Sequence, residues 1–288
     1  MFDKNKFFQG YEKYLPLFII TLTIIYLINV LNLSYWTDIK FRNIFGLNDW
    51  LTSTYENEYP MLWIQMFREG SPTEYLQWFY LGTAVVLCFI LFLFIYRRSA
   101  SFPWGWLLLV KGLGIMFLED VINLRHKLSG FVAADILEVT SRAEFFGDPR
   151  RSYIELSVYL VLGIIMIVAL IYILKDKKTS YFGKKLLLAG YILYGTAALA
   201  SATRHLGEWY TRVGQEILLR LYPDNWASFL ESNHIYGFMF MDYLVEESVE
   251  LLGAAFLLAA IVAFTAQNTK KTDAVEPASN LHENTTNT

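Results

Sequence analysis

Cysteine and charge are both scarce in this sequence. Its 288 residues include one cysteine, Cys88, and 18% of them are charged, against about 25% in soluble domains. A single cysteine excludes an intrachain disulfide and any metal or iron–sulfur site that needs several thiolates. The 24 basic and 27 acidic residues leave a net charge of −3, so no nucleic-acid partner is expected.

Apolar residues, by contrast, make up 55% of the chain and occur in long blocks. A helix of about 20 apolar residues crosses the roughly 30 Å hydrocarbon core of a bilayer. The blocks therefore predict an all-α fold, a polytopic transmembrane helical bundle whose first partner is the lipid bilayer. Six spans are expected, at about 15–33, 75–96, 104–125, 152–174, 186–203 and 238–264.

The segments outside these blocks predict the rest of the organisation. Residues 1–266 are expected to form one membrane domain, and the polar residues 267–288 a disordered cytoplasmic tail. The aromatic stretch 34–74 is interrupted by prolines, which is typical of short interfacial helices in an extracytoplasmic loop. Apolar residues recur at helical spacing over 206–221, so the fifth span is predicted to continue as an amphipathic helix.

Basic residues near the span ends predict the orientation. An alternating path places the N-terminus, Arg97-Arg98, the lysine-rich loop 175–185 and Lys270-Lys271 on one side. Loops rich in lysine and arginine remain in the cytoplasm. We therefore expect an integral protein of the cytoplasmic (plasma) membrane with both termini inside.

The last predicted span is unusual because it carries Asp242, Glu246, Glu247 and Glu250 in its first half. A charged group at the centre of a lipid-facing helix costs about 3 kcal/mol on insertion scales. At 100° per residue, Asp242, Glu246 and Glu250 lie on one face and Glu247 flanks it. Other helices are therefore expected to cover that face.

Spans three to five supply further ionic residues at the same depth, whereas the first two spans supply none. The third presents Glu119, Asn123 and His126 on one face, with Asp120 beside it. The ionic residues that these three spans place beneath the outer surface are Glu119, Asp120, Arg125, His126, Glu155, Arg204, His205 and Glu208.

Charge does not balance in this predicted outer layer. Eight carboxylates face two arginines and two histidines, which leaves an excess of negative charge even if both histidines are protonated. Such an excess is not stable in a low-dielectric site unless protons, a bound cation or water compensate it. The pattern therefore predicts a cation- or proton-binding pocket on the outer-leaflet side of spans three to six, serving ion transport or sensing.

Two alternatives remain open at this stage. In one, the polar residues form only a structural network, with Arg125 and Arg204 paired to two of the acids. In the other, the protein is a membrane-embedded metalloenzyme that acts on a small lipophilic substrate, with Glu247 or Asp120 as base. Carboxylates and imidazoles on facing helices are how helical bundles hold metals. The candidate ligands of a divalent metal ion are Glu119, His126, His205, Glu208, Glu246 and Glu250.

Overall fold

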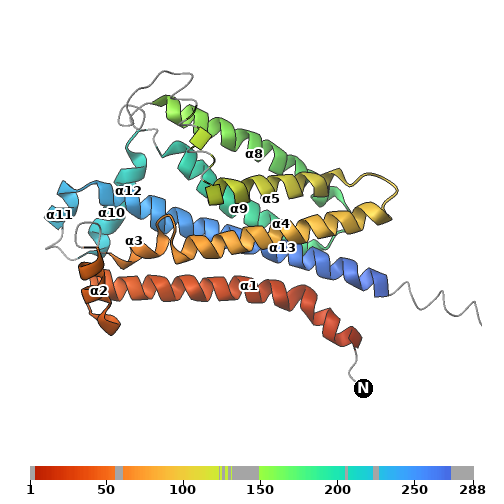
Figure 1. The fold of residues 1–288 in the computed structure, drawn as a ribbon, viewed down its shortest axis with the longest axis horizontal. Helices are drawn as coiled ribbons and strands as arrows, with labels where there is room; N and C mark the ends of the chain where they lie inside the picture. The colour runs from red at the N-terminus through yellow and green to blue at the C-terminus, as the bar shows by residue number, and fades with distance from the viewer. Residues whose placement is uncertain are drawn as a thin grey trace, which may run out of the picture.

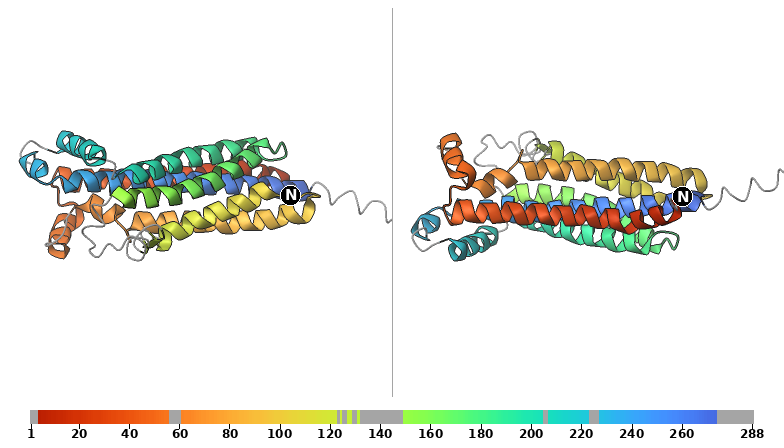
Figure 2. Two further views of the ribbon diagram at one scale, coloured as in Figure 1. Left: turned by 90° about the horizontal axis from the view of Figure 1, so that it is seen from above. Right: turned by 90° about the horizontal axis from the view of Figure 1, so that it is seen from below.

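The computed structural model describes residues 4–55, 61–122, 124, 127–128, 131, 149–204, 207–222 and 227–273. Over these residues the chain is helical and contains no strand, which confirms the predicted all-α fold. The long helices are α1 (Lys4–Ser34), α4 (Pro72–Arg98), α5 (Trp104–Ile122), α8 (Pro149–Lys175), α9 (Tyr181–Thr203) and α13 (Glu247–Asp273). They run side by side as a bundle (Figures 1 and 2).

Shorter helical elements gather at the end of the bundle away from the N-terminus (Figure 1). They are η1 (Tyr35–Ile39), η2 (Ile44–Gly46), α2 (Leu47–Thr54), α3 (Leu62–Phe67), α10 (Trp209–Leu221), α11 (Ala227–Ser232), α12 (Ile235–Met239) and η4 (Phe240–Glu246). Asp38 of η1 is buried, and its two carboxylate oxygens accept hydrogen bonds from the backbone N–H groups of Leu62 (2.8 Å) and Trp63 (3.0 Å). These bonds satisfy donors at the start of α3 that would otherwise lack partners, and they join η1 to α3.

Five helical stretches are long and apolar enough to cross a membrane: Lys13–Ile39, Leu62–Arg98, Leu156–Lys175, Tyr181–Thr203 and Ile235–Asn268. The chain is therefore an integral membrane protein. The predicted span 104–125 is not among the five, because Lys111, Glu119 and Asp120 lie within the 19 residues of α5. Six spans, the orientation and an interfacial position for the short helices stay predictions.

Helix α13 forms the centre of the bundle, with α9, α1 and α4 packed around it. A helix that is apolar on every side belongs in an interior, and from Leu251 to Phe264 its side chains are almost all buried. Close packing depends on small residues. A Cβ added to Gly190 of α9 would lie 2.9 Å from the Leu257 side chain, so α9 approaches α13 more closely there than a larger residue would allow.

One predicted continuation of a helix is wrong. The fifth span does not continue as one helix, because α9 ends at Thr203 and α10 begins at Trp209. Gly207 lies between them at φ 80°, a left-handed conformation that interrupts a helix. Helix α13 continues to Asp273, and the division into a membrane domain at 1–266 and a tail at 267–288 stays a prediction. The disorder predicted for 274–288 lies outside the described residues.

Candidate functional site

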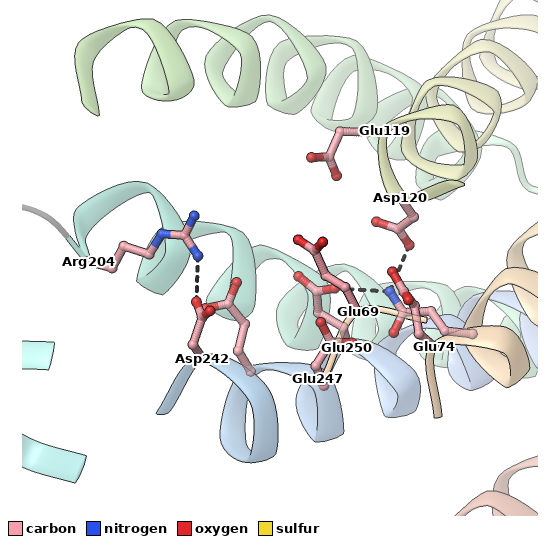
Figure 3. Close-up of a pocket in the computed structure, with 10 residues that line it drawn as sticks. Glu69, Glu74, Glu119, Asp120, Arg204, Asp242, Glu247 and Glu250 are labelled. Carbon is pink, nitrogen blue, oxygen red and sulfur yellow. Dashed lines mark hydrogen bonds and ion pairs between the residues drawn. The ribbon is translucent and has the colours of Figure 1, made fainter. Parts of the chain in front are cut away.

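A small acidic cavity lies between the first halves of η4–α13 and the ends of α4, α5 and α9 (Figure 3). Its volume is about 60 Å³, enough for a few water molecules. The described residues that line this acidic cavity are eight carboxylates, one arginine and one glutamine, namely Glu69, Glu74, Gln77, Glu119, Asp120, Arg204, Asp242, Glu246, Glu247 and Glu250.

The four acids of the last long helix all line the cavity, including Glu247, which was expected only to flank it. The cause is local geometry. Phe240–Glu246 is π-helical, and a π-helix closes its backbone hydrogen bonds over five residues instead of four. The π-helical segment therefore shifts Asp242 relative to the acids that follow it, whereas Glu247 and Glu250 keep α-helical spacing and lie about 60° apart, so that both reach the cavity.

Glu119 and Asp120 reach the cavity from α5, opposite α13 (Figure 3). Glu119 is buried. Asp120 Oδ2 accepts hydrogen bonds from Gln77 Nε2 at 2.7 Å and from the Tyr194 hydroxyl at 2.9 Å. Gln77 Nε2 also donates to Glu250 Oε2 at 3.0 Å. A single amide thus connects the carboxylates of α5 with those of α13.

The prediction that the first two spans contribute no ionic residue is wrong. Helix α4 supplies Glu74 and the polar Gln77, and the turn before it supplies Glu69. Hydropathy placed the start of this span at Tyr75, one turn too late. Ser71 caps the helix by accepting from the Glu74 N–H at 3.3 Å, and Glu74 accepts from the Gly70 N–H. The pattern Ser71-x-x-Glu74 is a capping-box signature that could have located this helix start.

Arg204, the C-cap residue of α9, pairs with Asp242 at 2.5 Å between Nη1 and Oδ1, and their side chains are 8% and 17% exposed. It is the only basic side chain among the described residues that line the cavity. This ion pair matches part of the predicted structural network. It compensates one carboxylate of the eight.

Tyr210 of α10 covers Glu246. Its hydroxyl donates to Glu246 Oε2 at 2.5 Å, and both residues are buried. Burial raises the pKa of Tyr210, and the adjacent Glu246 raises it further. The phenol therefore remains protonated and acts as a hydrogen-bond donor. Neither Tyr194 nor Tyr210 was predicted as a site residue, since an isolated tyrosine in or near an apolar block carries no distinctive pattern.

Several predicted residues are not placed at the cavity. Glu208 is exposed and is not among the described residues that line it. The remaining predicted residues, of which nothing is described at the side-chain level, are Asn123, Arg125, His126, Glu155 and His205.

The described residues do not support the predicted metal site. They contain no group of three or more His, Cys, Asp or Glu side chains arranged to hold a metal ion. Of the six proposed ligands, Glu208 is exposed and does not line the cavity, and both histidines lie outside the described residues. No protein-family model, no curated protein and no solved structure matches this chain.

Two buried acceptors in the cavity wall point to something that donates to them. Gln77 Oε1 and Glu247 Oε2 are both buried, and neither has a hydrogen-bond partner among the described residues. Gln77 is 1% exposed. A buried acceptor without a donor costs about 1–3 kcal/mol. Water, a protonated carboxyl group or a cation would satisfy both atoms.

Proposed function

We propose that this membrane protein binds and exchanges protons at the acidic cavity, as part of ion transport or of sensing. The observation that carries the proposal is the charge of the wall, where eight carboxylates and one arginine surround about 60 Å³. Two like charges 4 Å apart repel by about 4 kcal/mol at an effective dielectric constant of 20. Full ionisation of such a wall would therefore be very costly, and positive charge must enter with water, as protons or as a cation.

The closeness of the carboxyl groups, and not the donors between them, favours protons as the main compensating charge. The Gln77 amide contacts Asp120 and Glu250, and the Tyr194 hydroxyl contacts Asp120. Two carboxyl groups that contact the same amide lie close enough to share a proton or to exchange one through water in the cavity. A metal ion would need several oxygen ligands in a fixed geometry, and the described residues offer no such group.

Infrared difference spectroscopy of the purified protein tests the proposal, because protonated carboxyl groups have a carbonyl band that carboxylates lack. At neutral pH we expect this band in the wild type and a smaller one in Glu247→Gln and Glu250→Gln. Glu208→Gln is the matched control, since Glu208 is exposed outside the cavity. If the wild type lacks the band and all variants have unchanged spectra, the proposal is contradicted, and the polar residues would then form only a structural network.

Two further measurements distinguish binding of a cation, transport of protons and sensing of pH. Adding Na⁺, K⁺ or Ca²⁺ should reduce the carboxyl band if that cation competes with protons for the cavity. Proteoliposomes containing a pH-sensitive dye should show proton flux that falls in Glu250→Gln if the protein transports. A band that responds to pH without any flux supports sensing.

A further inference from the structure

A second, apolar cavity adjoins the acidic one. Its volume is about 330 Å³, within the roughly 300–1,000 Å³ of small-molecule sites. It lies between α5, α8, α9 and α13, and Glu119 and Glu250 line both cavities. We call it the apolar groove. The acidic cavity and the apolar groove therefore meet at two carboxylates.

The groove opens away from the core. Ile167 of α8 and Ile192 of α9 line it and are 56% and 60% exposed. A Cβ added to Gly163 or Gly195, which also line it, would meet nothing within 4 Å. Because α8 and α9 are both candidate membrane spans, the opening faces the region that lipid occupies. A molecule dissolved in the bilayer can reach it without crossing water.

The wall of the groove is apolar except at its inner end. The described lining residues are aliphatic residues, aromatic residues, methionine or glycine, apart from Glu119 and Glu250. No lysine or arginine is among them, and Arg204 lines the acidic cavity without lining the groove. An occupant suited to this wall has a hydrocarbon body and a cationic head, because the carboxylates at Glu119 and Glu250 attract a positive charge and repel an anion.

We propose that the groove binds a lipophilic amine from the membrane, with its hydrocarbon between α5, α8 and α9 and its ammonium group at Glu119 and Glu250. A primary alkylamine resembles a lysine side chain and carries a positive charge at neutral pH. The inference deepens the proposed function and rests on its requirement for positive charge at the acidic cavity. The amine would supply one such charge, so its binding is coupled to the exchange of protons.

Equilibrium binding of radiolabelled dodecylamine to the full protein in lipid nanodiscs tests this, with empty nanodiscs subtracted. Gly195→Leu fills the groove and leaves every carboxylate in place. Gly114→Leu in α5 is the matched control, because Gly114 also faces open space but is not among the described residues that line the groove. We expect saturable binding to the wild type, about tenfold weaker binding to Gly195→Leu, and little change in Gly114→Leu. Tenfold corresponds to about 1.4 kcal/mol.

Equal binding by the two leucine variants would overturn the groove as the site. Gly163→Leu, which fills the same space from α8, gives an independent version of this comparison. Dodecanol has the same chain without the charge, and equally tight dodecanol binding would overturn recognition of the ammonium group. Equal unfolding midpoints of Gly195→Leu and Gly114→Leu show that a loss of binding is not a loss of folding.

The infrared band distinguishes failure of this inference from failure of the proposed function. If the wild type shows the carboxyl band but does not bind the amine, the amine site is contradicted and the proposed proton exchange stands. If the protein shows no carboxyl band but binds the amine, and Gly195→Leu weakens that binding, the proposed proton exchange is contradicted and the amine site in the groove stands.

Discussion

Arg204 and Asp242 form an ion pair in the wall of the acidic cavity. When one partner of a buried pair is removed, the other remains as an uncompensated buried charge, which costs about 3–5 kcal/mol. We expect Arg204→Gln to lower the free energy of unfolding by about this amount, and Asp242→Asn to lower it by less, because Arg204 would still face the other carboxylates of the cavity wall. Denaturant unfolding in detergent micelles measures it.

The double variant Arg204→Gln with Asp242→Asn separates pairing from other contacts of either residue. With both charges absent, the loss should be smaller than the sum of the two single losses, by about 0.5–3 kcal/mol. Arg220→Gln is the control, because Arg220 is exposed in α10, and it should change stability by less than about 0.5 kcal/mol. Strictly additive losses would show that the two side chains do not depend on each other.

The charged residues of the cavity could be predicted from the sequence more readily than its uncharged residues. The acids of 238–264 stand out because charge is rare in a hydrophobic block, and depth along the helices placed Glu119 and Asp120 opposite them. Gln77 and Tyr194 carry no charge. Their importance comes from neighbours on other helices, and no local pattern in the sequence records such neighbours.

At the scale of elements, the contact between α9 and α13 provides a matched pair of positions on one helix. A Cβ at Gly190 would lie 2.9 Å from the Leu257 side chain and 3.0 Å from its backbone nitrogen, whereas one at Gly195 would meet nothing within 4 Å. Gly190→Ala should therefore destabilise the protein by about 1–3 kcal/mol through overpacking. Gly195→Ala should be neutral or stabilise it by up to about 1 kcal/mol, because alanine favours the helix.

Thermal unfolding of the two alanine variants in the same detergent compares them directly. The same chemical change on the same helix removes differences in helix propensity and in membrane insertion. Similar unfolding midpoints for both variants would mean that α9 does not approach α13 as closely as the structure has it.

The boundaries of elements were predicted less well than their existence. Long apolar blocks predict helices because burial of about 20 residues outweighs local preference, and α1, α4, α8 and α9 fall where the blocks lie. The π-helical segment Phe240–Glu246 and the break at Gly207 are local departures from α-helical geometry inside or beside apolar blocks, and hydropathy does not record them. Gly214 in α10 and Gly237 in α12 approach each other closely, because neither carries a Cβ.

For the whole molecule, the connections between the long helices lie at the two ends of the bundle, and the predicted alternating path of six spans stays a prediction. The start of α1, the α4–α5 and α8–α9 connections and the end of α13 lie at one end of the bundle, and the short helices lie at the other (Figures 1 and 2). Which end faces the cytoplasm depends on the membrane and not on packing. It therefore stays a prediction from the arginines and lysines near the span ends.

The single cysteine makes this orientation directly measurable. Cys88 is fully buried, so the wild-type protein should not react with a membrane-impermeant maleimide. Ser53 in α2 and Lys177 between α8 and α9 are both exposed, at opposite ends of the bundle. In intact cells, Ser53→Cys should be labelled, and Lys177→Cys should be labelled only after the membrane is permeabilised. The reverse pattern would place the acidic cavity nearer the cytoplasm, and the protons it exchanges would then come from inside the cell.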